Sequence, residues 1–262
     1  MSDFEFNATH REFKLVNALG CARASLLAYE KDSTLLKRTA AGWGFDNCEP
    51  LPHENHFGFV MGNSDVLLVV FRGTDEPVDW LTNLNVLFKR SPLGWTHRGF
   101  MKAVELFWPD LPQWISKFRD RSQPVWVAGH SLGGALAVLA AAKLAGEEGL
   151  EVDGVYTFGQ PPVGTVGFCR KFKERFANRF FRFVNHTDAV ADVAILFMEH
   201  VGEVRYFDTS GALWLGQPPW RVSLFDGIRA SARFGGFAEF AAHSMRKYVE
   251  LLERHVSEEA AL

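Results

Sequence analysis

The segment Gly129-His130-Ser131-Leu132-Gly133 has the residue types and the spacing that most directly predict chemistry. A serine with glycines two positions before and after it is typical of a sharp strand-to-helix turn, which exposes the serine hydroxyl as a nucleophile. The helix after such a turn begins with unpaired N–H groups and a partial positive charge, and both stabilise an oxyanion. The segment therefore predicts acyl transfer through Ser131, with a base and a carboxylate to activate it.

The carboxylate is expected after the serine and before the histidine, which is the chain order in hydrolases with this turn. Asp188 satisfies this order and lies in the loop that follows an apolar strand pattern at residues 180–184. Asp192, slightly later in the chain, is the competitor, and either carboxylate could instead cap a turn. The sequence favours Asp188 and leaves Asp192 open.

Four histidines follow the nucleophile and are candidates for the base. His186 precedes the acid and so violates the chain order. His243 lies at the predicted start of the last helix, after a loop, from which it can project over the serine. His200 precedes a predicted strand, and His255 lies at the exposed end of the last helix, where we expect it to cap the helix or to be solvated. The sequence therefore favours His243.

The positions of these residues depend on a series of strand and helix patterns. Apolar and β-branched runs predict strands at residues 56–61, 65–72, 124–128, 152–158 and 180–184. Apolar residues at helical spacing predict helices at residues 12–30, 100–119, 132–145, 167–177 and 237–255, the second interrupted near Pro109 and Pro112. A hairpin is expected over residues 203–215. Strands that alternate with helices predict an α/β fold with a mostly parallel central sheet flanked by helices, in a single domain over residues 1–262.

The composition is that of a globular protein, with 47% hydrophobic and 23% charged residues. A net charge of −3, with Lys and Arg spread along the chain, does not provide the concentrated basic face that nucleic-acid binding requires. No apolar run reaches the roughly 20 residues that a membrane-spanning helix needs. We therefore expect neither a nucleic-acid partner nor a transmembrane segment.

The cysteines Cys21, Cys48 and Cys169 are widely separated and odd in number. They lack the close spacing of a zinc site and do not suit a disulfide framework, which favours a reducing compartment. The N-terminus is polar and lacks the apolar stretch of a secretory signal. We expect a cytoplasmic protein, or an exported one if the chain is a mature form that has lost its leader.

Several short motifs lie in a fixed order along the chain: Val70-Phe71-Arg72-Gly73-Thr74, Asp79-Trp80-Leu81, His97-Arg98-Gly99-Phe100, the GHSLGGALA segment around Ser131, Thr157-Phe158-Gly159-Gln160-Pro161, Arg182-Phe183-Val184-Asn185 with Asp188-Ala189-Val190, His200-Val201-Gly202-Glu203-Val204, and His243 with Tyr248. Jointly they resemble the class 3 lipases, the fungal-type triacylglycerol lipase family, over residues 55–252. The resemblance implies the α/β-hydrolase fold with its nucleophile elbow at Ser131.

The same resemblance implies a catalytic triad of Ser131, Asp188 and His243. It implies an oxyanion hole formed by the N–H of Leu132 and by Thr74, through its N–H and its hydroxyl. It implies no metal and no cofactor.

The resemblance also assigns structural roles to His130, under the turn, and to His200. The sequence departs from the family pattern at three positions. Pro162 stands where an Arg is usual, Ala191 replaces a common Pro, and Ala242 precedes the catalytic histidine where an Asp is frequent. None of these departures removes a catalytic group.

Class 3 lipases cover the site with a short amphipathic lid just after the first oxyanion residue, and the matching segment here is residues 75–88. Trp80, Leu81 and Leu84 lie at helical spacing within it. When open, such a lid would contact a lipid interface transiently, although an ordinary packed helix would show the same spacing. A second candidate cover is the aromatic-rich segment over residues 212–240.

The function predicted by the sequence and its resemblance is a serine carboxylester hydrolase, foremost a triacylglycerol lipase that acts through an acyl-enzyme on Ser131. Alternatives within the enzymes are a short-chain or aromatic-acid esterase such as a feruloyl esterase, a phospholipase, a thioesterase or a peptidase, because the triad alone does not choose the acyl donor. The alternative of another class is a non-catalytic lipid-binding scaffold. A profile of activity against acyl-chain length would separate them.

Overall fold

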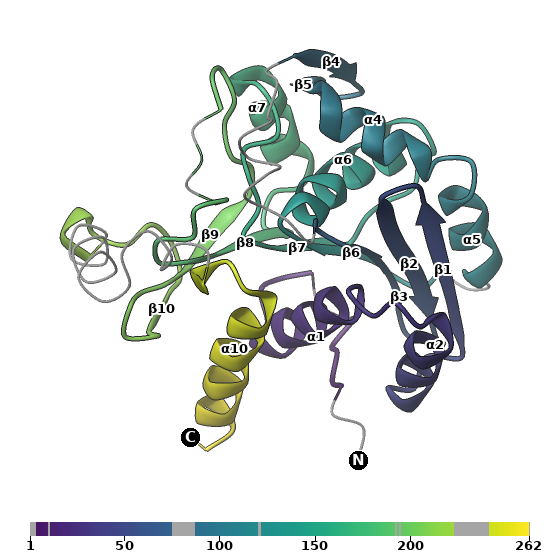
Figure 1. Cartoon of the computed structure of the whole chain (residues 1–262), viewed down its shortest axis with the longest axis horizontal. Coiled ribbons are helices and arrows are strands. Elements are labelled where there is room, and N and C mark those ends of the chain that lie inside the picture. The colour runs from purple at the N-terminus through teal and green to yellow at the C-terminus, as the bar shows by residue number, and fades with distance from the viewer. Residues whose placement is uncertain are drawn as a thin grey trace.

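A computed structural model describes residues 4–9, 11–74, 87–119, 122–191, 193, 195–222 and 241–261 of the chain. Its centre is an eight-stranded sheet with the spatial order β1-β2-β3-β6-β7-β8-β9-β10 (Figure 1). In that order the strands are Asn47–His53, His56–Gly62, Leu67–Phe71, Val125–His130, Gly154–Phe158, Phe180–Asn185, Glu203–Phe207 and Leu213–Trp214. A separate two-stranded ribbon pairs β4 (Phe88–Ser91) with β5 (Gly94–His97).

The middle of the large sheet is parallel, from β3 through β6, β7 and β8 to β9. The strands β1 and β2 at one edge and β10 at the other are antiparallel to their neighbours. Because the carboxyl ends of parallel strands meet at one edge of a sheet, the segments after β3, β6, β7 and β8 come together there. The sheet therefore gathers the residues that follow Phe71, His130, Phe158 and Asn185.

Helices cover both faces of the sheet (Figure 1). One face carries α4 (Arg98–Leu106), α5 (Leu111–Phe118), α6 (Leu132–Gly146) and α7 (Val166–Arg175). The opposite face carries α1 (Leu15–Leu27), α2 (Ser33–Gly42) and α10 (Met245–Ala260). The predicted α/β architecture, with a mostly parallel sheet between layers of helices, is confirmed.

Two buried apolar clusters hold these layers together, one on each face of the sheet. Strand β3 is buried along its whole length, as a continuous apolar run predicts. Helix α6 is Ala- and Leu-rich and buried on nearly all sides, because α4 packs over it and the sheet lies beneath it. The small side chains of α6 allow this central helix to lie close to the sheet and to its neighbours.

Several elements differ from the sequence expectations. The opening helix is shorter than predicted, and a separate helix, α2, follows it. Strand β1 was not predicted because it contains Pro50 and Pro52. Both prolines lie on an edge strand and are two residues apart, so both of their missing N–H groups face away from β2.

Two further differences lie close to the candidate site. The hairpin β4–β5 begins at Phe88, where the sequence predicted the end of a lid helix. The last helix, predicted over residues 237–255, begins only at Met245 and continues to Ala260. His243 therefore precedes the helix and lies in a turn instead of on the helix itself.

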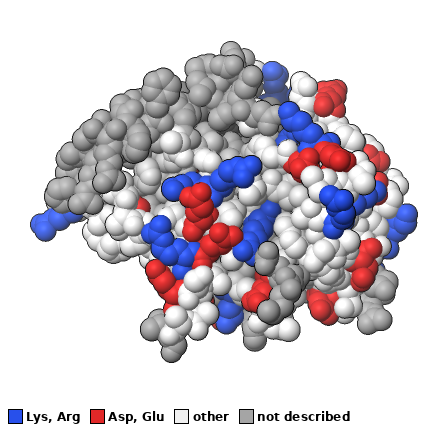
Figure 2. All heavy atoms as spheres, turned by 60° about the horizontal axis from the view of Figure 1, so that its bottom comes forward, with Lys and Arg blue, Asp and Glu red and all other residues white. Residues whose placement is uncertain are grey.

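Charged side chains of both signs are interspersed on the face shown in Figure 2. Ion pairs such as Arg23–Glu253 and Lys37–Glu49 join side chains of opposite charge. Among the described residues, no helix has the length and apolar character needed to cross a membrane.

Candidate active site

Ser131 occupies a strained turn between β6 and α6. Its backbone φ is 57° and its ψ is −128°, and a non-glycine residue in such a region costs on the order of 1–3 kcal/mol. The main-chain N–H of Ser131 donates to the carbonyl of Phe158 at the end of β7, over 2.9 Å. The surrounding strands thus hold the serine in this conformation, and its side chain is fully buried.

The two glycines that flank the turn are required by close backbone approach. A methyl group on Gly129 would lie 2.2 Å from the carbonyl oxygen of Gly133. A methyl group on Gly133 would lie 2.2 Å from the carbonyl oxygen of Phe71 in β3. Any side chain at either position would therefore push α6 away from the strand ends that define the turn.

His243 and Asp188, which the sequence paired as base and acid, are in direct contact. Nδ1 of His243 lies 2.8 Å from Oδ1 and 3.0 Å from Oδ2 of Asp188. Because a carboxylate only accepts hydrogen bonds, Nδ1 carries the proton and Nε2 is left as the basic nitrogen. Both side chains are buried, so their interaction is little screened by solvent.

The Asp188 carboxylate accepts three further hydrogen bonds. The hydroxyl of Tyr248 donates to Oδ2 over 2.6 Å, and the main-chain N–H groups of Val190 and Ala191 donate to Oδ1 over 3.0 and 3.2 Å. Burial alone raises the pKa of this carboxyl, but His243 and the hydrogen bonds outweigh burial and lower the pKa below its usual value. Asp188 is therefore ionised and its lone pairs are occupied.

Two buried polar atoms in this region have no hydrogen-bond partner among the described residues: Oγ of Ser131 and Nε2 of His243. Burying such groups unpaired is costly, so their presence needs an explanation. In free enzymes, catalytic hydrogen bonds are often long or poorly aligned and shorten when substrate binds. The two atoms belong to the residues that the sequence predicts as nucleophile and base.

The two residues predicted to bind the oxyanion follow β3 and β6. Leu132 is the first residue of α6, so its N–H has no acceptor within the helix. Thr74 follows Gly73, where an added methyl group would lie 2.9 Å from Cβ of Ser131. The chain at Gly73, just before Thr74, is thus packed directly against the turn at Ser131.

The other three histidines that follow the nucleophile in the chain, His186, His200 and His255, make other contacts. Burial and the nearby Arg182 lower the pKa of His200 to about 3, and His186 lies 3.0 Å from the hydroxyl of Thr187. The expectation for His255 was wrong, because its ring stacks on Phe207 and its Nε2 lies 2.8 Å from the carbonyl of Gly211. None of these three rings is in contact with Asp188 through a hydrogen bond between described atoms.

The lid residues Trp80, Leu81 and Leu84 and the alternative acid Asp192 lie outside the described residues. Leu87 and Phe88, the last two residues of the predicted lid segment, are described and exposed. In the second candidate cover, Trp214 donates from Nε1 to Asp208 over 2.9 Å, and Trp220 is exposed. The remaining aromatic residues of that cover also lie outside the described residues.

Sequence reasoning assigned no role to three residues that the structure places around His243 and Asp188. Asn185 and Tyr248 were visible within motifs, and they contact the turn at His243 and the carboxylate. Tyr29 belongs to no recognised motif, and only the fold brings its hydroxyl into contact with the ring of His130. Within the described residues, no group of three His, Cys, Asp or Glu side chains could hold a metal ion.

Comparison with known families and proteins gives consistent matches. A family model described as "Lipase (class 3)" matches residues 68–198, which include both the turn at Ser131 and Asp188. Phospholipase A1-II 4 of Oryza sativa subsp. japonica is 29% identical over 188 residues, which cover 60% of this chain and 47% of that protein. Triacylglycerol lipase OBL1 of Arabidopsis thaliana is 26% identical over 251 residues, which cover 72% of this chain and 48% of that protein. The chain thus spans about half the length of these relatives.

Among solved structures, the Lip2 lipase of Yarrowia lipolytica superposes with a TM-score of 0.64 at 20% identity, covering 80% of this chain and 86% of that one. At this level of identity the likeness concerns the fold. The predicted α/β-hydrolase fold is confirmed by it.

Proposed function

The chain belongs to the class 3 lipase family, and from this premise we propose that it is a serine carboxylester hydrolase that cleaves lipid esters through an acyl-enzyme on Ser131. The observation that carries the proposal is the buried hydrogen bond between His243 and Asp188. It leaves Nε2 of His243 as a base at the same edge of the sheet as the strained turn of Ser131.

The proposed reaction begins when Nε2 of His243 takes the proton from the Ser131 hydroxyl. The serine oxygen bonds to the ester carbonyl carbon, and Asp188 stabilises the imidazolium that forms. The carbonyl oxygen, now negative, accepts hydrogen bonds from the N–H of Leu132 and from Thr74. Loss of one such donor typically costs about 3 kcal/mol of barrier.

Collapse of this intermediate breaks the bond to the alcohol, which leaves with the proton from His243. A water molecule then attacks the acyl-enzyme, and its proton passes to the same nitrogen. The carboxylic acid is released and Ser131 recovers its proton. In the proposed reaction, Nε2 of His243 carries every proton transfer.

We propose a triacylglycerol as the foremost substrate, with a phospholipid as the second candidate, because relatives are named for both classes. The test is hydrolysis of p-nitrophenyl esters from acetyl to stearoyl, of emulsified triacylglycerol, and of phosphatidylcholine vesicles. Long-chain preference with activity on the emulsion supports a lipase, and activity on the vesicles alone supports a phospholipase. A preference for acetyl or aromatic-acid esters would overturn the lipid substrate and favour an esterase.

The matched variants for this test are Ser131→Ala and Ser25→Ala. Ser25 is also fully buried and its hydroxyl also has no hydrogen-bond partner among the described residues, but it lies within α1. The first variant should lose hydrolysis and the second should keep it. A folded wild-type protein that is inert on every ester would instead favour a lipid-binding scaffold.

Contact with a lipid interface through the lid over residues 75–88 is part of the proposal. Two exposed apolar side chains at the end of that segment, Leu87 and Phe88, support it. We also propose action in the cytoplasm, because all three cysteines are free. Immunoblotting of the separated cytoplasm and medium of the producing cells tests this location, and accumulation in the medium would contradict it.

A further inference from the structure

The ring of His130 lies between Tyr29, which follows α1, and the turn that carries His243. Its centroid is 4.5 Å from that of the His243 ring, and the two planes are inclined by 30°. Nε2 of His130 lies 2.7 Å from the main-chain carbonyl oxygen of His243. Nδ1 lies 2.7 Å from the hydroxyl oxygen of Tyr29. Both ring nitrogens of His130 are therefore engaged.

The partners of His130 determine where its proton lies. A main-chain carbonyl can only accept, so Nε2 must carry the hydrogen. Burial, with a further contribution from His243, lowers the pKa of His130 to about 3. The ring is consequently neutral, its Nδ1 is an acceptor, and the hydroxyl of Tyr29 is the donor.

The main chain around His243 is held by side chains on both sides. His243 lies in a turn just before α10, which begins at Met245. Nδ2 of Asn185, at the end of β8, donates to the carbonyl of Ala242 over 2.8 Å. Nε2 of His130 donates to the next carbonyl, that of His243. These two donors fix the peptide groups on either side of the catalytic imidazole.

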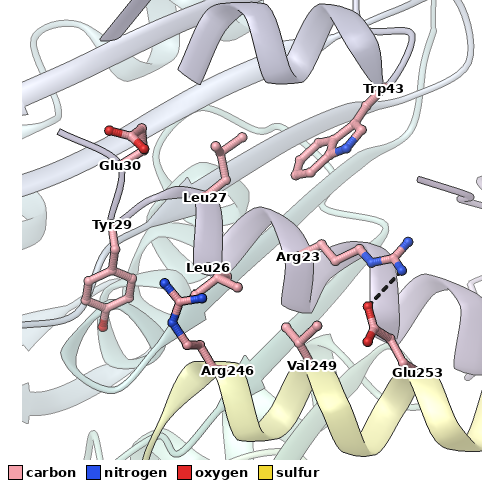
Figure 3. A pocket seen from close by; sticks show the side chains of 9 residues that line it. All are labelled: Arg23, Leu26, Leu27, Tyr29, Glu30, Trp43, Arg246, Val249 and Glu253. Carbon is pink, nitrogen blue, oxygen red and sulfur yellow. Dashed lines mark hydrogen bonds and ion pairs between the residues drawn. The ribbon is translucent and has the colours of Figure 1, made fainter. Parts of the chain in front are cut away.

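Tyr29 lies just after the C-terminal end of α1, and its N–H donates to the carbonyl of Leu26. It lines a surface groove between α1 and α10 with Leu26 and Arg246 (Figure 3). Its hydroxyl reaches the interior, because a methyl group on Gly73 would lie 2.5 Å from that oxygen and 2.9 Å from Cβ of Ser131. The hydroxyl of Tyr29 is thus packed against both the oxyanion loop and the turn of the nucleophile.

We propose that Tyr29 is a positioning residue for the catalytic base: by donating to Nδ1 of His130, it holds the His130 ring in the orientation in which Nε2–H fixes the carbonyl of His243. This inference rests on the proposed function for its effect on catalysis. Tyr29 lies outside residues 68–198, which the family model matches, and it acts through the ring of His130. Its role is to restrict the position of His243 relative to Ser131.

Removal of the Tyr29 hydroxyl leaves the His130 ring with a single anchor. The ring can then rotate about its Cβ–Cγ bond, and the hydrogen bond to the carbonyl of His243 weakens. Small misplacements of a catalytic group lower the rate steeply, so kcat of Tyr29→Phe should fall roughly tenfold. Substrate binding does not depend on this contact, so KM should stay within about twofold of its wild-type value.

The experiment compares Tyr29→Phe with Tyr156→Phe in steady-state hydrolysis of a soluble p-nitrophenyl ester. Tyr156 is a matched control, because its hydroxyl also makes a hydrogen bond, to the main chain of Lys14 at the opposite end of α1 from Tyr29. A double-mutant cycle with His130→Phe measures how far the effects of Tyr29 and His130 on kcat depend on each other. In that background, Tyr29→Phe should have no further effect on kcat.

Exchange of the His130 Nε2–H proton with water, followed by NMR on protein labelled with nitrogen-15 histidine, gives a readout that needs no substrate. Exchange should be faster in Tyr29→Phe and unchanged in Tyr156→Phe. A wild-type kcat in Tyr29→Phe, an equal loss of kcat in the His130→Phe background, or unchanged exchange would overturn the inference. Ester hydrolysis that survives Ser131→Ala would overturn the proposed function instead, and the exchange measurement would still decide whether Tyr29 holds His130.

Discussion

At the scale of single residues, the hydrogen bonds around Asp188 explain how a fully buried carboxylate can stay charged. Tyr248, itself fully buried, donates to Asp188 and accepts from the main-chain N–H of Asn185 over 3.0 Å. One phenol thus joins the acid to the end of β8. Hydrogen bonds to a charged acceptor are stronger than neutral ones. This contact therefore stabilises the ionised form of the carboxylate and also orients it.

Tyr248→Phe should therefore remove one hydrogen bond to the Asp188 carboxylate while the aromatic ring stays in place. We expect kcat to fall about tenfold and the free energy of unfolding to fall by about 1–3 kcal/mol, because a buried charge loses a donor. Steady-state kinetics and urea unfolding measure the two effects. Unchanged kcat together with lower stability would mean that Tyr248 supports the fold and does not orient Asp188.

Some residues of the candidate site could be identified from the sequence, and others could not. Chain order and the turn motif favoured Ser131, Asp188 and His243 but left Asp192 open, and the family resemblance implied the first three; their catalytic roles stay predictions. One departure from the family pattern has a physical meaning in the structure, since Ala191 donates its N–H to Asp188, which a proline could not do. The part played by Tyr29 could not be predicted, because it depends on where α1 ends relative to β6.

At the scale of elements, the junction of β6 and α6 determines the geometry of the nucleophile. Gly133 lies where α6 meets the end of β3, and a methyl group there would also lie 2.7 Å from the carbonyl carbon of Arg72. These neighbours are backbone atoms, so they cannot rotate away. The close approach of strand and helix is thus part of the site.

Gly133→Ala should displace α6, lower the melting temperature by several degrees and reduce ester hydrolysis at least tenfold, because the proposed oxyanion donor, the N–H of Leu132, moves with the helix. Gly42→Ala is the matched control, since it lies in α2 with no atom within 4 Å of the added methyl group. That change should be neutral or stabilising by up to about 1 kcal/mol. Equal behaviour of the two variants in thermal unfolding would contradict this account of the junction.

Prediction of the elements succeeded where local pattern and tertiary environment agree. Strands such as β3 and β6 are continuous apolar runs because helices cover both of their faces. Strand β1 and the ribbon β4–β5 lack that signal, since prolines interrupt the first and the second is exposed along much of its length. Pairing with a neighbour, which no local pattern contains, makes them strands.

At the scale of the whole molecule, two apolar clusters on opposite faces of one sheet extend from α5 to α10. Such continuity supports the expectation of a single domain over residues 1–262, which stays a proposal. Coincident unfolding transitions in tryptophan fluorescence and circular dichroism would support it. Two separate transitions would contradict it.

Stability should fall in mild acid because of two histidines on opposite sides of the sheet. Burial, with His243 in one case and Arg182 in the other, lowers the pKa values of His130 and His200 to about 3. The unfolded chain binds these protons below about pH 6.5, but the folded protein does not. The free energy of unfolding is therefore fully maintained above about pH 6.5. Between about pH 6.5 and 3 it declines by up to about 1.4 kcal/mol per pH unit for each histidine.

Urea unfolding at about pH 7 and at about pH 5 measures this decline. The variant His130→Gln should show a shallower pH dependence than the wild-type protein, because one of the two titrating groups is gone. An identical slope in wild type and variant would mean that His130 can bind a proton in the folded state. That result would also contradict the neutral ring assigned to it beside His243.

The most direct test of the central claim is to identify the residue that reacts with a fluorophosphonate ester, by mass spectrometry of the labelled protein. We expect one phosphonyl group per chain, attached to Ser131, with loss of ester hydrolysis in proportion to labelling. Attachment at another residue, or continued hydrolysis after Ser131 is fully labelled, would contradict Ser131 as the nucleophile.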